Sequence, residues 1–514
     1  MNSNQEKNAV AVPCLFDRTV PEEISAECLL PDYKGAISRL LYVRPAFSEA
    51  GHFIGGSKAD ISGRVRFDAL YVNADGLPEA AGCEEQYALS LPVDLNGYDP
   101  DAGVTFQVTV QPESVVTRVS APRRLSVRCR FSVRVRAFAA RSLAVALPAG
   151  TDGVQMLCDK AEYGRHFAGQ GNAEVTGDIP FEGGGEPVVV AARGAVYLPD
   201  VTAIADGVRC AGEVIVTLLC RREGEGEEAA FTLQKRLPFE EPVAADGVTT
   251  ECSAAAEGEV TEIRVDVGDD VLSVTAVVGL AVTATVTDPV VFVRDLFLPG
   301  MAADCRTEQT QLPAPGACYN RHFSISAVCR EGALPVGAAL IDVFGETEIS
   351  EKTVEGGRTA LAGTVTCHAL CRTGAEYAAG ETDFTFRVFV EGDLSAADVR
   401  ASVPILRLYE EGGAWRADGE VQLAVTAGGT VTVSRVAGAS FKEAPQEKRA
   451  DLELCYPAPG ETLWSVAARY GVSPAALAAE NGIAGDDPGD PASLCGVRRL
   501  LIPQGDCENA SDCI

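Results

Sequence analysis

Four histidines and 17 cysteines are the residues of this 514-residue chain best suited to metal binding or nucleophilic chemistry. One cluster, Cys367-His368-x-x-Cys371, combines two thiols with an imidazole, which are ligand types that zinc prefers. A repeat within the chain aligns Cys367 with Phe67 and Val216, which are apolar residues. The two cysteines are therefore predicted to pack in a core, and no metal site is expected.

The chain shows no local motif for catalysis. None of the histidines lies in a catalytic pattern, and the glycine-rich segments 55–58 and 183–185 lack the Lys-Ser/Thr ending of a phosphate-binding loop. His166 and His322 share an Arg-His-Phe sequence and are expected to fix the entry to a repeat instead of doing chemistry. We expect no enzyme activity, no catalytic residue and no cofactor.

Charge and composition limit the partners and the compartment. The chain has 43 basic and 73 acidic residues, and the net charge of −30 disfavours binding to nucleic acid or to anionic membranes. The N-terminal residues lack the features of a signal peptide, and no apolar run reaches the length of a membrane span. The cysteines are odd in number and form no C-x-x-C pair. We therefore expect a cytoplasmic protein whose cysteines are reduced.

A row of arginines stands out in this acidic chain. Arg128, Arg130, Arg134 and Arg136 alternate along one strand and so line one face of it. Such a row is typical of a solvated sheet face opposed by acids on a neighbouring strand. A docking site for an acidic partner is the alternative.

Most of the chain alternates apolar and polar residues, as in segments 104–110, 125–135 and 384–390. This period of two predicts half-buried strands, and glycine-rich punctuation between them favours antiparallel sheets. The pattern Gly-x-Val-x-x-x-x-Leu occurs three times, beginning at Gly63, Gly212 and Gly363, with spacings of 149 and 151 residues. The sequence thus predicts three β domains of one kind, at 13–146, 160–295 and 316–437, followed by a polar linker at 438–451.

The last segment, 452–504, changes to a helical period. Leu463, Val466 and Tyr470 fall on one helical face, and Gly471 follows as a C-cap. Ser473-Pro474 predicts the start of a second helix, and short apolar segments on either side predict two strands. A mainly β chain with a small βααβ domain at its end is the predicted fold.

This segment resembles the LysM family, through the series Gly460-Glu461-Thr462-Leu463-Trp464, Tyr470-Gly471-Val472-Ser473, Asn481 and Leu500-Leu501-Ile502-Pro503. The resemblance implies a groove that binds N-acetylglucosamine polymers, lined by Gly460, Glu461, Thr462, Leu463, Asn481, Gly482 and Ile483. The alternative is structural: Thr462 and Asn481 cap the helices, while Leu463 and Ile483 are core. Trp464 is a candidate anchor for a protein partner, or else it packs on the adjacent strands or linker.

The repeats resemble the SPOCS domain of spore-coat assembly proteins, through Leu30-Pro31-Asp32-Tyr33-Lys34-Gly35, Ser62-Gly63-Arg64-Val65 and Ala69-Leu70-Tyr71-Val72. Tandem repeats of this kind followed by one LysM module resemble clostridial coat-morphogenesis proteins. The resemblance implies an adaptor at the forespore surface that self-associates and captures the spore-coat morphogenetic ATPase of the basement layer. The alternative is a protein that binds peptidoglycan or another N-acetylglucosamine polymer.

Overall fold

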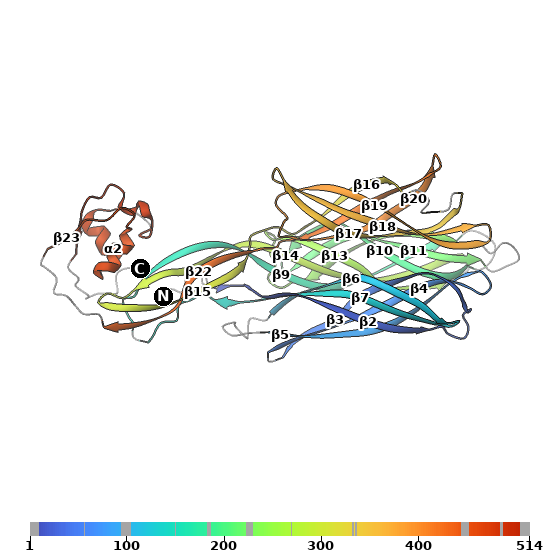
Figure 1. Ribbon diagram of the computed structural model, residues 1–514, viewed down its shortest axis with the longest axis horizontal. Helices are drawn as coiled ribbons and strands as arrows, with labels where there is room; N and C mark the ends of the chain where they lie inside the picture. Colours follow the sequence, from blue (N-terminus) through green and yellow to red (C-terminus); the bar gives the residue numbers. More distant parts are fainter. Residues whose placement is uncertain are drawn as a thin grey trace.

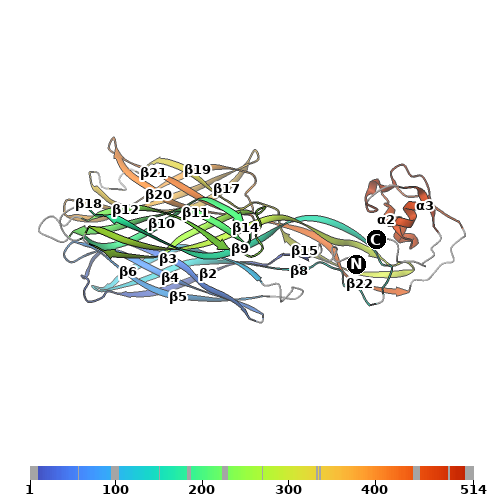
Figure 2. The same ribbon diagram turned by 180° about the vertical axis from the view of Figure 1, so that it is seen from behind.

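The computed structural model describes residues 10–55, 57–93, 104–149, 151–181, 187–222, 230–268, 270–330, 334, 337–443, 452–483 and 487–503. Three β domains lie side by side, a narrow stalk extends from them, and a small helical module lies at the far end of the stalk (Figures 1 and 2). The prediction of a mainly β chain that ends in a helical module is confirmed. Among the described helices, none has the length and apolar character needed to cross a bilayer.

Each domain is a sandwich of two three-stranded antiparallel sheets. In the first domain, one sheet contains β3 (Ile37–Gly55), β4 (Lys58–Asn73) and β5 (Pro78–Pro92), and the other contains β2 (Cys14–Leu29), β7 (Arg124–Ala139) and β6 (Val104–Ala121). In the second, they are β10 (Pro187–Ile204), β11 (Gly207–Arg222) and β12 (Phe231–Ala244), against β9 (Gln155–Pro180), β14 (Val271–Phe297) and β13 (Ser253–Val267). In the third, they are β17 (Ala339–Glu355), β18 (Arg358–Thr373) and β19 (Glu376–Glu391), against β16 (Tyr319–Val328), β21 (Ala414–Thr426) and β20 (Asp398–Glu411). The order of strands along the chain is the same in all three.

The repeated glycines lie at equivalent points, as the repeat predicts. Gly63, Gly212 and Gly363 are on the middle strands β4, β11 and β18, directly opposite Tyr87, Phe239 and Phe386 of the neighbouring strands. A Cβ at Gly63 or Gly363 would collide with the facing aromatic ring. Glycine is therefore required there, because it leaves room for the ring beside the backbone.

The repeated leucines meet between the domains. Leu70, Leu219 and Leu370 are each 2–3% exposed and belong to one apolar cluster, which we call the leucine hub. Because equivalent residues of three copies contact one another, the domains pack around a common axis. One chain thus forms an assembly that resembles a closed ring of three subunits.

Replacing Leu219 with alanine is expected to lower the free energy of unfolding by about 2–5 kcal/mol, because it opens a cavity in the leucine hub. Leu29→Ala is the matched control, because Leu29 is 63% exposed and its loss should change stability by less than about 0.5 kcal/mol. Guanidinium unfolding followed by circular dichroism measures both. Leu219→Ala and Leu370→Ala should also be non-additive, and strict additivity would show that the three leucines do not share a core.

The stalk consists of three two-stranded ribbons. They are β1 (Val10–Ala11) with β8 (Arg141–Ser142), the 155–163 end of β9 with the 288–297 end of β14, and β15 (Met301–Pro313) with β22 (Thr430–Glu443). Their shared core contains Ala11, Leu143, Tyr163, Val290, Phe292, Leu312 and Val433. The ribbons thus repeat the threefold arrangement of the domains.

The stalk corrects the predicted boundaries. Strand β15 falls between the second and third predicted domains, and residues 438–443 of the predicted linker belong to β22. The rest of that linker, 444–451, lies outside the described residues, as does the tail after 503. The ribbon was missed because residues 301–313 do not alternate in polarity, and their partner strand lies more than 100 residues away.

A buried arginine joins the ribbons. The Arg435 side chain is 4% exposed, and its guanidinium lies 3.1 Å from the Glu308 carboxylate. It also donates to the Leu143 carbonyl at 3.2 Å and to the Thr310 hydroxyl at 3.3 Å. Arg141 contacts the other oxygen of Glu308 at 2.7 Å. The Glu308 carboxylate therefore balances the positive charges of two arginines that lie on different ribbons.

The arginine row on β7 is a solvated sheet face, as predicted. Arg130 pairs with Glu23 at 2.7 Å and Arg134 with Asp17 at 2.7 Å, and both acids lie on the neighbouring strand β2. One end of the row also meets the third domain, because Arg134 lies 3.3 Å from Asp398 of that domain. Arg136, whose side chain is only 10% exposed, lies 3.8 Å from the same carboxylate. The acids on β2 therefore neutralise arginine charge that would otherwise be available to an acidic docking partner.

The prediction that all cysteines are reduced is wrong for one pair. Cys28 and Cys83 form a disulfide that joins β2 to β5, across the two sheets of the first domain. Cys367 and Cys371 are free thiols in the core of the third domain, as predicted. Within the described ranges, no group of three potential ligands is placed to hold a metal ion.

The two histidines of the shared Arg-His-Phe sequence each pack against an aromatic ring of another domain. His166, in the second domain, stacks on Phe138 of the first at 5.0 Å between ring centroids, and burial lowers its pKa to about 4. His322, in the third domain, lies 5.3 Å from the Tyr197 ring of the second. Each histidine thus packs on the domain that precedes its own.

Candidate functional site

The module at the stalk tip has the predicted βααβ order. It contains β23 (Glu453–Cys455), α2 (Leu463–Tyr470), α3 (Pro474–Asn481), a short 3₁₀ helix η1 (Pro491–Leu494) and β24 (Leu500–Ile502). Thr462 begins α2 in a capping box with Ser465, and Ser473 begins α3. Gly471 and Gly482 end the helices at φ of 59° and 62°, the left-handed conformation that favours glycine.

The loop that enters α2 is closely tied to the rest of the module. The N–H of Glu461 donates to the Ala458 carbonyl, that of Thr462 to the Ser465 hydroxyl, and that of Leu463 to the Ser493 hydroxyl. The Glu461 carboxylate accepts from the Ala458 N–H and pairs with Arg469. Backbone donors expected to read acetamido groups here are therefore used within the protein.

In the loop that leaves α3, the polar groups are also hydrogen-bonded within the module. The N–H groups of Gly482 and Ile483 donate to carbonyls at the end of α3. The Asn481 amide donates to the carbonyls of Leu477 and Leu501, at 2.9 and 2.7 Å, and accepts from the Leu501 N–H at 2.7 Å. Asn481 thus ties α3 to β24 and has little capacity left for a ligand.

The remaining predicted groove residues divide into exposed and buried ones. Gly460 and Gly482 are exposed, and space beside each is open. Leu463 is 4% exposed and Ile483 packs on the same core, as the structural alternative predicted. The groups of the groove that a ligand can contact are therefore mainly the glycine backbone and backbone carbonyl oxygens.

The Trp464 side chain is buried between the module and the stalk. It is 5% exposed, its ring lies 4.9 Å from that of Phe297, and its indole N–H donates to Asp295 at 2.8 Å. Both contacts lie at the end of β14, where a bulge between Val293 and Asp295 interrupts the ladder. The prediction of a partner anchor is corrected: Trp464 holds the module on the stalk.

The contact between module and stalk was not predicted from the sequence. Leu157 and Phe297 of the stalk belong to the same apolar core as Val466 and Leu477 of the module. The module core therefore continues into the stalk. No sequence signal identified Asp295, Phe297 or Leu157, because they belong to strands that are far from the module in sequence.

One strand of the module exposes apolar side chains. Leu452, Leu454 and Tyr456 are 68%, 44% and 71% exposed, and they alternate along β23 and its flanks. Alternate residues of a strand lie on one face, so these three form an apolar strip on the module. Sequence reasoning assigned this segment only as a strand.

The structure therefore defines a multidomain protein in which a stalk joins three β domains to a small capped βααβ module. Residues 458–488 match the LysM domain family, and this range contains all the predicted groove residues. The chain therefore carries a LysM module, which supports binding to peptidoglycan or N-acetylglucosamine polymers. No curated protein and no solved structure matches the chain.

Proposed function

We propose that this protein is a non-catalytic structural adaptor of spore-coat assembly. Its LysM module captures the morphogenetic ATPase of the coat basement layer, in the mother-cell cytoplasm at the forespore surface. The resemblance of the three repeats to SPOCS domains supports this assignment. The shape of the molecule is also suited to it, because the stalk holds the module away from the three β domains (Figure 2).

The apolar strip formed by Leu452, Leu454 and Tyr456 is the observation that carries this proposal. Exposed apolar groups that lie together are typical of protein interaction sites. A tyrosine beside leucines also suits a protein interface, in which aromatic residues dominate the binding energy. The groove, by contrast, has most of its backbone donors already engaged.

The second candidate function is binding to peptidoglycan or another N-acetylglucosamine polymer, and the LysM family match favours it. In this case the ligand meets the exposed loops around Gly460 and Gly482, where backbone carbonyl oxygens accept from its N–H and O–H groups.

Co-purification of the tagged full-length chain from sporulating cells of its host tests the adaptor. The expected result is recovery of an ATPase, identified by mass spectrometry and by ATP hydrolysis of the complex. Leu454→Ser with Tyr456→Ser should reduce this recovery at least tenfold, because both side chains are exposed and available for contact.

Leu29→Ser is the matched control, since Leu29 is 63% exposed, between Leu454 at 44% and Tyr456 at 71%, but lies in the first β domain. Sedimentation with insoluble peptidoglycan tests the second candidate on the same preparations. Failure to recover an ATPase, together with retention on peptidoglycan, would overturn the adaptor in favour of the glycan binder.

A further inference from the structure

The small sheet of the LysM module is open at one edge. It has two strands, β23 and β24, with Leu454 directly opposite Leu501. The outer edge of β24 is closed, because the Asn481 amide accepts from the Leu501 N–H and donates to the Leu501 carbonyl. In the part of the chain that the structure describes, no strand pairs with the outer edge of β23.

The backbone of Leu454 points out of this open edge. In an antiparallel ladder, each residue either exchanges both its N–H and its C=O with the residue opposite or directs both away from it. The N–H and C=O of Leu501 are bound to Asn481 on the far side, so Leu454 and Leu501 form a pair of the second kind. The N–H and the carbonyl of Leu454 are therefore a donor and an acceptor directed away from the sheet.

The same residue is the centre of the apolar strip. Leu452 and Tyr456, on either side of it, are 68% and 71% exposed. The half-buried Leu501 side chain lies next to that of Leu454, since side chains are close in a pair of this kind. The edge thus combines backbone hydrogen-bonding groups with apolar surface, which is the combination used when an extended peptide adds a strand to a sheet.

Two arginines lie beside the strip. Arg498 and Arg499 are exposed and directly precede β24. Because Cys455 pairs with Leu500, these arginines are next to the end of the strip that Tyr456 forms. A segment that covers the strip therefore meets positive charge at one end.

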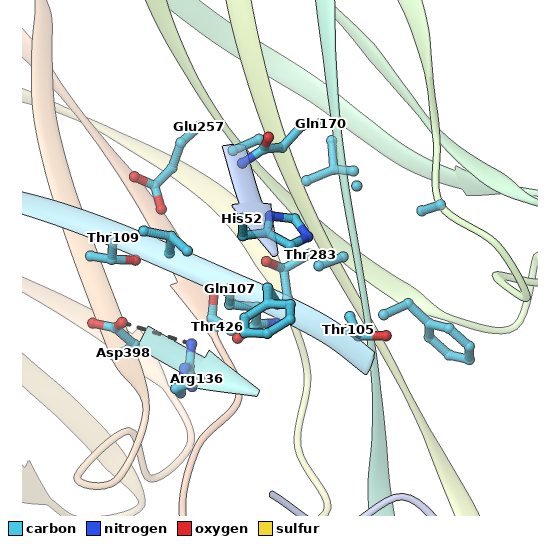
Figure 3. A pocket seen from close by; sticks show the side chains of 18 of the residues that line it. His52, Thr105, Gln107, Thr109, Arg136, Gln170, Glu257, Thr283, Asp398 and Thr426 are labelled. Atoms are coloured by element: carbon cyan, nitrogen blue, oxygen red, sulfur yellow. Dashed lines mark ion pairs between the residues drawn. The ribbon is translucent and has the colours of Figure 1, made fainter. Parts of the chain in front are cut away.

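No described acid forms an ion pair with either arginine, whereas charges elsewhere in the chain are paired internally. In the cavity where the three β domains meet, Arg136 lies 3.8 Å from Asp398, as the dashed line in Figure 3 marks. Arg469, on α2 of the module, pairs with Glu461. Arg498 and Arg499 are thus available to an acidic group of a partner, in a chain whose net charge of −30 otherwise repels such groups.

We propose that β23 receives an extended segment of the partner protein as a third strand of this sheet. The proposal rests on the proposed adaptor function and specifies how the partner is held. The backbone of the segment bonds to the N–H and carbonyl of Leu454, and its apolar residues, at alternate positions, cover the strip. An acidic residue at one end of the segment pairs with Arg498 or Arg499.

Leu454→Pro tests the backbone part of the proposal. Proline has no N–H and is accepted on edge strands, and the ladder with β24 does not use this N–H. Leu454→Ala is the matched control, because it shortens the side chain and keeps the N–H. In the co-purification of the full-length chain, Leu454→Pro should recover about tenfold less ATPase than Leu454→Ala, since a partner carbonyl loses its donor. Equal recovery by the two variants would show that only side chains are recognised and would overturn the proposal.

Hydrogen exchange provides a readout without any substitution. Mass spectrometry of the full-length chain should show that one amide within residues 452–456 exchanges fast in the free chain and slowly in the complex with the ATPase. Unchanged exchange in this segment of the complex would overturn the proposal. Slow exchange of all its amides already in the free chain would do so as well, because another part of the chain or a second copy would then occupy the edge.

A charge reversal tests the acidic end of the segment. Arg498→Glu with Arg499→Glu should lower recovery of the ATPase, and the loss should shrink as salt rises, because salt screens exposed charges. Arg264→Glu is the control, since its side chain is 60% exposed but lies in the second β domain. Recovery unaffected by the double reversal would overturn the charge assignment. Failure of the adaptor function itself is distinguishable, because the parent chain would then recover no ATPase at all.

Discussion

Trp464→Ala is expected to release the LysM module from the stalk and to destabilise the module by about 3–5 kcal/mol, the usual cost of removing a buried large aromatic ring. The ring packs against Phe297, and the indole N–H is hydrogen-bonded to Asp295. Both contacts are lost together. Calorimetry should show a separate early transition for the module, and small-angle scattering should show a larger maximum dimension.

Two further variants separate the effect of losing the aromatic ring from that of losing the hydrogen bond, and control for changes elsewhere on the helix. Trp464→Phe keeps an aromatic ring next to Phe297 but loses the hydrogen bond to the Asp295 carboxylate, and should cost about 1.5–3 kcal/mol. Arg469→Ala changes an exposed residue of the same helix and should leave the scattering profile unchanged. An unchanged profile for Trp464→Ala as well would mean that the module does not depend on this contact.

Glu308→Ala is expected to lower the free energy of unfolding by about 3–5 kcal/mol, because it leaves the Arg435 guanidinium buried without a counter-charge. Urea unfolding measures the change. Glu391→Ala is the matched control, because Glu391 and its partner Arg358 are 76% and 59% exposed and such pairs contribute less than about 1 kcal/mol.

A double variant tests the reason for that loss. Glu308→Leu with Arg435→Met removes the buried pair, and it should be clearly more stable than Glu308→Ala because the Arg435 charge no longer stays buried without a partner. Arg141, the other partner of Glu308, has a side chain that is 21% exposed and can reach solvent. Equal stability of the two variants would contradict the role given to Glu308.

The repeated domains could be predicted because each copy carries its own pattern. Gly63 and its counterparts each face an aromatic residue, and the valine two positions later packs in the core of its own domain in every copy, so local sequence contains most of what a copy needs. The closure of three copies around an axis could not be predicted, since it depends on contacts between domains. The same holds for the Cys28–Cys83 disulfide, whose partners are 55 residues apart.

The residues of the candidate site also divide into those whose role local sequence predicts and those whose role depends on distant parts of the chain. Thr462 was recognisable as a helix cap, because capping depends on residues within one turn. Asn481 instead bonds to Leu501, 20 residues further on, and Trp464 to Asp295, 169 residues back. Sequence spacing does not measure either distance in space. The two alternatives for Trp464, a partner anchor or packing on the adjacent strands or linker, therefore did not include the stalk.

The arrangement of three repeats in one chain has a consequence for how the molecule behaves on dilution. A trimer of separate subunits dissociates when its concentration falls, but tethered copies meet at an effective concentration set by the connecting segments. The contacts of the leucine hub therefore persist in a protein present at very low copy number.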